Sequence, residues 1–274
     1  MSLTSMQLYP LLPRDLGEAE RALLSGTPVE GWCPICGRLT RFMDATENLR
    51  ESCFCEHCRS TNRQRQMAFV LLRVLEEMRP ARLLSLGDVA ALDEPVRIHN
   101  SESSGAVHDA LRSNTGYTFS EYFGPEHASG ALVNGVMHQD LTRCSFGDAS
   151  LDVLMSSDVF EHIPEPYLAH AEVFRILKPG GRHVFTVPFL WDRWLDERRA
   201  EASPSGEIRH LLPPELHGDP VRPDAGILVF LKPSFEMCVR LARIGFEPRI
   251  YRPHLPWCGI VGQALVFDAV KPAQ

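Results

Sequence analysis

The sequence contains no apolar run near the roughly 20 residues that a membrane-spanning helix needs. Its first residues hold no charged segment followed by an apolar stretch, so a secretory leader is not expected. Positive charge is also scarce: 28 lysines and arginines stand against 35 aspartates and glutamates, which gives a net charge of −7. No overall positive field then draws the chain to anionic membranes or to nucleic acid. We expect a cytoplasmic protein without a membrane partner.

Cysteine is concentrated rather than scarce, because five of the eight cysteines fall between residues 33 and 58. In a reducing compartment we expect thiols or metal ligands rather than disulfides. Two Cys-x-x-Cys pairs stand at a separation typical of a two-knuckle zinc ribbon. The predicted ligands of a structural Zn²⁺ are Cys33, Cys36, Cys55 and Cys58. Cys53 could replace Cys55, and His57 is a further alternative. Free core cysteines or a redox pair are the other interpretations, but no thioredoxin-like βαβ pattern surrounds the pairs.

A helical pattern follows the second cysteine pair and ends before Pro80. The arginines at its start are interpreted as a solvated helix start, with nucleic-acid contact as the alternative, because no aromatic platform accompanies them. They are Arg59, Arg63 and Arg65. A shorter helix is expected over residues 15–24, closed by Gly26. We therefore predict a helical extension (1–30), a zinc ribbon with its connecting helix (31–80) and a larger domain (81–274).

The most informative stretch is residues 151–189. Residues 151–155 form an apolar run of strand length, and apolar residues then recur at helical spacing up to Leu177. The sequence Lys-Pro-Gly-Gly at 178–181 is predicted to stop this helix, and residues 183–187 are β-rich again. A helix over 233–244 and strands over 245–251 and 262–270 continue the alternation. The pattern predicts a doubly wound α/β sheet, whose ligands bind at the carboxyl ends of the strands.

The sequence of residues 151–189 resembles those of class I S-adenosylmethionine (SAM) dependent methyltransferases, in which a strand ending in Asp-x-x-Glu-His precedes a helix ending in Leu-Lys-Pro-Gly-Gly. The resemblance extends from residue 96 to Phe246, close to a bacterial subfamily with an altered cofactor loop. It implies a Rossmann-like, seven-stranded α/β fold that binds SAM and transfers its methyl group. With the cysteine pairs, the predicted architecture is this domain behind a small zinc ribbon.

The first strand of such a domain is usually followed by a Gly-rich turn, Asp-x-Gly-x-Gly-x-Gly, which this chain lacks. Residues 83–88 are set aside as the cofactor loop, because no helix of suitable length follows them. The better candidate is a short strand over 96–99, the loop 100–105 and a helix over 106–111, in which small residues let the backbone approach a ligand. Glu121, about 20 residues on, suits the ribose hydroxyls.

The resemblance further implies that Asp140 accepts from the adenine amino group and that the following amide faces the ring. A dinucleotide enzyme is the rival, but no Gly-x-Gly-x-x-Gly is present. The predicted SAM-binding residues are Asn100, Ser101, Glu102, Gly105, Glu121, Tyr122, Asp140, Leu141, Ser157 and Asp158.

Methyl transfer to oxygen or nitrogen often needs a base, and the predicted candidates are His210, His217 and His162. The first two lie in an insertion, residues 190–232, that is long enough to build an acceptor pocket. In related quinone-biosynthesis O-methyltransferases, a similar run to Asp158, Glu161 and His162 is implicated in holding a divalent cation, so Mg²⁺ or Mn²⁺ could bind here. The alternative is that Glu161 and His162 only cap the next helix.

We predict O-methylation of a small metabolite, such as a sugar or secondary-metabolite hydroxyl. A ribosomal RNA methyltransferase is the first rival, which the acidic net charge disfavours. The second is a SAM-type fold without activity, in which the zinc ribbon docks a partner.

Overall fold

The computed structural model describes residues 17–203, 205–218, 226–262 and 264–273, which form two compact units. The first unit comprises Met1–Ile98, Ser103–Thr118 and Arg249–Asp268, less the residues outside those ranges. The second comprises His99–Glu102, Phe119–Pro248 and Ala269–Gln274, with the same restriction. Both units therefore combine segments that are far apart in the sequence. The predicted domain boundaries near residues 30 and 80 stay a prediction.

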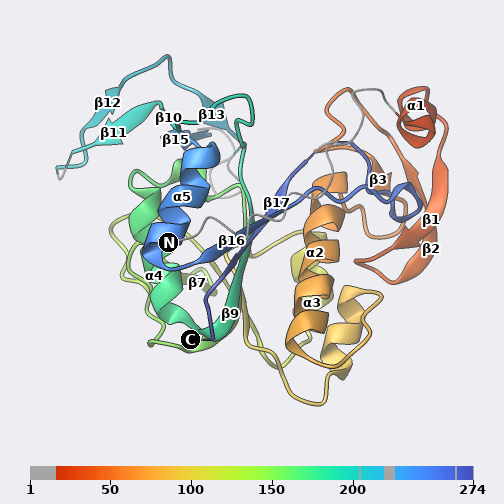
Figure 1. Cartoon of the computed structure of the whole chain (residues 1–274), viewed down its shortest axis with the longest axis horizontal. Helices are drawn as coiled ribbons and strands as arrows, with labels where there is room; N and C mark the ends of the chain where they lie inside the picture. The colour runs from red at the N-terminus through yellow and green to blue at the C-terminus, as the bar shows by residue number, and fades with distance from the viewer. Residues whose placement is uncertain (1–16, 204, 219–225, 263, 274) are drawn as a thin grey trace. The chain divides into compact units, whose positions relative to one another are not determined.

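The first unit contains a three-stranded antiparallel sheet of β1 (Val29–Cys33), β2 (Arg38–Met43) and β3 (Phe54–Cys55) (Figure 1). Phe42 pairs with Val29 on one side and Cys55 on the other, and its side chain is fully buried. Helix α1 (Glu18–Leu24) precedes the sheet, and Gly26 follows it with a φ of 82°. The short N-terminal helix is thus present, while its expected first residues lie outside the described ones.

Helix α2 (Asn62–Met78) begins at a capping box, in which Thr61 accepts from the amide of Gln64 and the Gln64 side chain accepts from the amide of Thr61. The helix buries an apolar face that includes Met67 and Leu71. The predicted helix that ends before Pro80 is confirmed. Residues 86–91 after it form a 3₁₀ helix, η1 (Leu86–Ala91), so the segment set aside as a cofactor loop follows no strand.

The large sheet has the strand order β16-β17-β9-β8-β4-β5-β7-β6. Its strands are β4 (Ile98–Asn100), β5 (Tyr117–Glu121), β6 (Leu132–Val133), β7 (Val136–His138), β8 (Leu151–Ser157), β9 (Leu177–Thr186), β16 (Glu247–Tyr251) and β17 (Val266–Val270). The pairs β5–β7 and β8–β9 are parallel. The predicted Rossmann-like α/β class is confirmed, including the loop at 100–105 between β4 and helix α3 (Ala106–Leu111).

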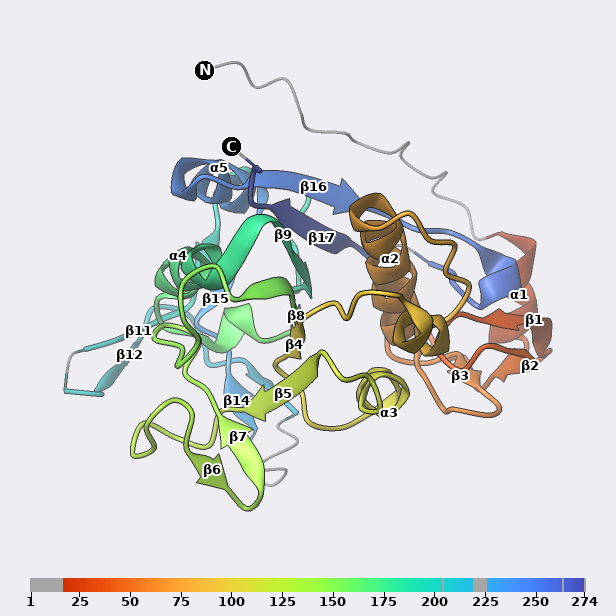
Figure 2. The same ribbon diagram turned by 90° about the horizontal axis from the view of Figure 1, so that it is seen from below.

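The expected count of seven strands is wrong by one. Strand β6 pairs antiparallel with β7 and adds an eighth strand beside it (Figure 2). The two strands are joined by Asn134 and Gly135, both with positive φ (52° and 82°). An Asn-Gly pair at these angles is the turn that two-residue hairpins favour. The Asn-Gly pair is thus a local sequence signal of this hairpin.

The Lys-Pro-Gly-Gly segment lies inside β9 rather than in a break before it. Helix α4 (Pro166–Ile176) ends at Ile176, and Leu177 already pairs with Leu151 of β8. The register of the two strands shifts after this pair, where Gly180 adopts a φ of 78°. The segment therefore forms a bulge, which absorbs extra residues while the strand continues. All seven residues of β8 are buried, as expected for a central strand.

The described residues of the insertion include three short antiparallel strand pairs. The pairs are β10 (Glu197–Arg198) with β15 (Leu231–Lys232), β11 (Ala200–Ala202) with β12 (Ile208–His210), and β13 (Leu216–His217) with β14 (Ile227–Leu228). Helix α5 (Phe235–Ile244) follows and lies beside α4, where Phe174 meets Phe246 edge to face at 5.0 Å (Figure 1). None of the described helices has the length and apolar character to cross a membrane.

Candidate functional site

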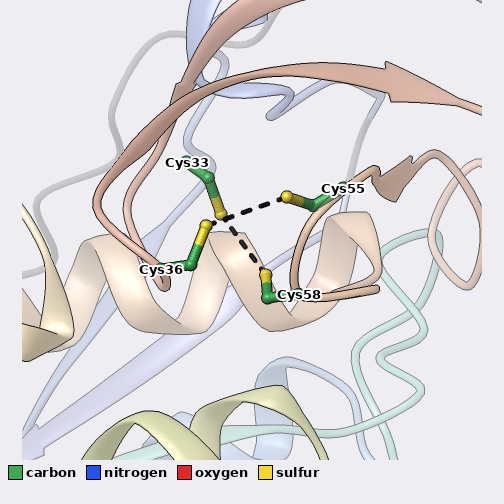
Figure 3. Close-up of side chains that lie close together, drawn as sticks. All are labelled: Cys33, Cys36, Cys55 and Cys58. Atoms are coloured by element: carbon green, nitrogen blue, oxygen red, sulfur yellow. Dashed lines mark hydrogen bonds between the residues drawn. The ribbon is translucent and has the colours of Figure 1, made fainter.

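Four cysteines of the first unit turn their sulfurs toward one another (Figure 3). Cys33 and Cys55 end strands β1 and β3, and each begins a tight turn to its partner. The amide of Gly37 donates to Cys33 O at 2.9 Å, and the amide of Arg59 donates to Cys55 O at 3.0 Å. Both residues have a left-handed backbone, with φ of 64° and 57°. The two turns therefore repeat one geometry, which explains why a glycine suits the first.

The distances between the sulfur atoms fit tetrahedral coordination of one metal ion. Cys33 Sγ lies 3.7 Å from Cys58 Sγ, and Cys36 Sγ lies 3.9 Å from Cys55 Sγ. Sulfurs bound to one Zn²⁺ at about 2.3 Å stand roughly 3.8 Å apart. Cys53 is buried outside this group, and burial raises the pKa of its thiol. His57 is exposed. The group contains Cys55 rather than either alternative.

The interpretation of a solvated helix start is wrong for Arg65. Its side chain is fully buried, with its carbon atom Cζ 4.6 Å from the centre of the Phe42 ring. The guanidinium donates to the carbonyls of Ser60, Cys53 and Gly259, the last at 2.8 Å. Two of these carbonyls lie in the loop that carries Cys55 and its partner. Arg65 therefore stabilises the second cysteine turn through these two carbonyls.

In the second unit, four of the expected cofactor segments follow strand ends. Ser101, directly after β4, is held beside β8, because its amide donates to Met155 O at 3.0 Å. Glu121 ends β5 and pairs in register with His138 of β7. The amide of Gln139 donates to Glu121 O at 3.1 Å, which brings Asp140 next to Glu121. Two acids therefore stand at neighbouring strand ends.

The remaining predicted cofactor residues differ in exposure. Tyr122 is exposed and Leu141 is buried. Asp140 Oδ1 accepts from the amide and the hydroxyl of Thr142 at 2.9 and 2.7 Å, so a local turn orients the carboxylate. In the first unit, Gly105 immediately precedes α3 as its N-cap and has a φ of 90°, a conformation that L side chains avoid. Asn100 is buried and Glu102 is half-buried.

The end of β8 carries a strained residue. Asp158 has a φ of 53°, while its amide donates to Thr186 O and its Oδ1 accepts from the Thr186 hydroxyl, both at 3.0 Å. Non-glycine residues in this region cost of order 1–3 kcal/mol and concentrate at functional sites. Ser157, the last residue of β8, is buried beside it. These two hydrogen bonds hold Asp158 against Thr186, the last residue of β9.

A second cluster lies just beyond, around the 3₁₀ helix η2 (Phe160–His162). Glu161 is fully buried, and its Oε1 lies 3.6 Å from His162 Nε2 and 3.6 Å from His217 Nδ1. The Glu161 carboxylate raises the pKa of His217, against the opposing effect of burial, and Glu215 adds to the rise. Asp158 is not a member of this cluster, although the sequence grouped it with Glu161 and His162. His217 takes its place.

The other predicted base lies apart from this cluster. His210 is exposed at the end of β12, where it pairs with Ala200. Three arginines of the insertion are engaged by nearby carboxylates. Arg193 and Arg199 both pair with Glu197, and Arg198 pairs with Glu165. Residues 192–198 with Leu211 and Leu212 line a hollow of about 670 Å³.

Sequence reasoning named His162 and His217 separately but missed that Glu161 joins them. It also missed the role of Glu215, whose Oε1 lies 3.4 Å from His217 Nε2. Glu215 and His217 are two residues apart around a strand, a spacing that puts side chains on one face. That spacing was the available signal for the pair.

Part of the chain is similar to known methyltransferases. Residues 104–185 match the family model described as a methyltransferase domain. Among curated proteins, an uncharacterized methyltransferase of Mycobacterium marinum is 36% identical over 63 residues, which is 23% of this chain and 24% of that protein. One from Mycobacterium avium is 44% identical over 67 residues, 23% and 26% of the two chains. The chain thus spans about a quarter of the length of these relatives.

Similar solved structures include the complex between the Haloferax volcanii Trm112 methyltransferase activator and a methyltransferase, with 15% identity, a TM-score of 0.41, and 77% of this chain and 94% of that chain covered. A SAM-dependent methyltransferase from Mesorhizobium loti is 15% identical with a TM-score of 0.39, and the match covers 66% of this chain and 94% of that chain. The segment that matches the methyltransferase-domain model runs from just before α3 into β9 of the large sheet.

Proposed function

We propose that the protein transfers the methyl group of SAM to a hydroxyl oxygen of a small metabolite. The observation that carries the proposal is the pair of acids at neighbouring strand ends, Glu121 as the last residue of β5 and Asp140 after β7. A carboxylate at the first position accepts from both ribose hydroxyls, and one at the second accepts from the adenine amino group. The loop after β4, with Ser101 at its start, then faces the methionine part of the cofactor.

The chemistry asks mainly for alignment, because the sulfonium already carries a good leaving group. We place the acceptor hydroxyl near the cluster of Glu161, His162 and His217, which follows the same edge of the sheet. Of the predicted bases, His162 and His217 lie in this cluster, whereas His210 is exposed and lies apart from it. The acidic chain favours a small acceptor over nucleic acid.

We further propose that the four-cysteine group holds a structural Zn²⁺. The sulfur distances of 3.7 and 3.9 Å support this, because they match the edges of a zinc–thiolate tetrahedron. A set of four thiolates leaves no open coordination position, so the ion would stabilise the fold of the first unit rather than take part in chemistry.

The deciding experiment is a calorimetric titration of the purified protein with S-adenosylhomocysteine. We expect one site per chain with micromolar affinity. Replacing Glu121 by Ala should weaken binding by about 1–3 kcal/mol, whereas Glu126→Ala, in an exposed acid nearby, should not. Absence of binding by the wild-type protein would refute the proposal and favour a scaffold. Tight, salt-sensitive binding to ribosomal RNA fragments would instead overturn the small acceptor.

A further inference from the structure

We infer that Glu161, His162 and His217 form a binding site for a divalent transition-metal ion, separate from the four cysteines. Around a tetrahedral Zn²⁺ with bonds of about 2.0–2.1 Å, ligand atoms lie roughly 3.4 Å apart. Glu161 Oε1 lies 3.6 Å from each imidazole nitrogen, and all three atoms lie within 4.8 Å of one another. The three groups are therefore spaced as ligands of one ion.

The hydrogen bond of His162 also indicates which of its two nitrogens faces the cluster. Its Nδ1 lies 2.9 Å from the carbonyl oxygen of Leu228, which can only accept, so Nδ1 carries the hydrogen. Nε2 is then the atom that faces the Glu161 carboxylate, at 3.6 Å. A cation between these two groups would be bound by both of them.

The surroundings of the Glu161 carboxylate also favour a bound cation. Its side chain is 0% exposed, and neither carboxylate oxygen accepts a hydrogen bond from any residue that the structure describes. A buried carboxylate without donors is costly, since removing such a charge from water costs several kcal/mol per ion. Its nearest polar neighbours in the cluster are the two imidazoles at 3.6 Å, which is longer than a hydrogen bond.

Both histidines have the outer partner that metal-bound imidazoles use. His162 is oriented by the carbonyl of Leu228, and His217 Nε2 lies 3.4 Å from Glu215 Oε1. Metal ligands of this kind commonly direct their second nitrogen to a carbonyl or carboxylate, which fixes the ring and raises its basicity. Glu215 is itself held by Lys232 at 2.7 Å. The arrangement therefore extends beyond the three ligands.

The ligands come from two parts of the chain that are held together. Glu161 and His162 belong to η2, whereas His217 lies on β13, which pairs with β14. The amide of Phe230 donates to Glu161 O at 2.8 Å and fastens the segment after β14 to η2. A bound ion would thus add a third link between the insertion and the sheet edge.

The donor set selects the kind of ion. Two imidazoles with one carboxylate suit Zn²⁺, Fe²⁺ or a similar transition metal, whereas Mg²⁺ and Ca²⁺ prefer oxygen ligands throughout. This differs from the sequence-based expectation of Mg²⁺ or Mn²⁺ with Asp158. The His217 side chain is 32% exposed, so an ion can enter from solvent and keep an open position for a water or a substrate oxygen. Metal binding itself does not depend on the proposed methyl transfer.

Native mass spectrometry of the full chain, dialysed against ZnCl₂, tests the inference. We expect two zinc ions per wild-type chain. His217→Ala and Glu161→Gln should each retain one, whereas His210→Ala, in the exposed histidine of the same insertion, should retain two. Cys33→Ser should lose the other ion. Circular dichroism shows which variants fold, and the half-exposed position of His217 makes His217→Ala the safer test.

A finer measurement follows the outer partner. Glu215→Gln should weaken the second zinc by 10–100-fold, because it removes the charge behind His217. Only one zinc per wild-type chain at saturation, or a second zinc that persists in folded His217→Ala, would overturn the site. Because S-adenosylhomocysteine binding is measured separately, a protein that binds it but takes up one zinc contradicts this inference alone.

Discussion

Arg65 offers the sharpest test of how the first unit is held together. We consider its replacement by methionine, which keeps an unbranched chain against Phe42 but removes the guanidinium. In the native fold this group bonds three carbonyls, those of Cys53, Ser60 and Gly259. Burial lowers the pKa of Arg65, and the surrounding cysteines oppose that effect. Four thiolates on Zn²⁺ carry a net charge of −2, so the cation also offsets the charge of the proposed ion site.

The magnitude follows from what the substitution leaves behind. Each buried carbonyl that loses its donor costs about 1–3 kcal/mol, so three carbonyls give an upper range of about 3–9 kcal/mol. Removal of the buried positive charge returns part of this, because that charge is costly to bury. We therefore expect Arg65→Met to destabilise the protein by about 3–5 kcal/mol, toward the lower end of that range.

Urea unfolding of both proteins, followed by circular dichroism and zinc release, measures this loss. The matched control is Arg59→Met, since Arg59 lies nearby but is 58% exposed and pairs with Asp44 at 3.5 Å. Exposed pairs contribute about 0–1 kcal/mol, so this variant should behave as wild type. If the two variants unfold at the same urea concentration, the carbonyl contacts of Arg65 do not hold the cysteine loop as argued.

Three further predictions concern Asp140, His170 and Glu20. Asp140→Asn should weaken S-adenosylhomocysteine binding by about 1–3 kcal/mol in a calorimetric titration, and unchanged affinity would exclude the adenine role. Burial lowers the pKa of His170 to about 3, so the unfolded chain takes up a proton that the folded chain excludes. Because of this residue, the free energy of unfolding should fall by about 1 kcal/mol per pH unit as the pH drops below about 6.5. In His170→Phe, the slope of the unfolding free energy against pH should be smaller by the contribution of one proton. Burial alone would raise the pKa of Glu20, but the Gly262 amide and His254 lower it below its ordinary value of 4.5. Its contribution is thus complete above that pH and is lost as the pH falls through the lower, folded value, so Glu20→Gln should destabilise the protein at neutral pH only; an equal loss at pH 3 would contradict this.

Local patterns were enough for most of the elements. The apolar run at Leu151 and the helical spacing up to Ile176 predicted β8 and α4, because period and side-chain burial are set by neighbours within a few residues. The two Cys-x-x-Cys pairs predicted the four-cysteine group for a similar reason, since each pair is a local turn. The loop between β4 and α3 was also found without a Gly-rich signature.

The errors came where a local signal was overridden or overlooked. Pro179, Gly180 and Gly181 look like a stop, but the strand resumes around them because β8 offers a partner across the bulge. Arg65 looks like a surface residue, and only the fold supplies three carbonyls that satisfy it in the interior.

The sequence by itself determined the α/β class, the paired cysteine turns and the acids at the strand ends, since each depends on residues close together along the chain. The tertiary structure alone decided which distant groups meet. Glu161 and His217 are brought together by the pairing of β13 with β14 and by the contact of Phe230 with Glu161. Such contacts arise from the packing of whole elements, and the spacing of residues along a sequence does not encode the distance between two elements in space.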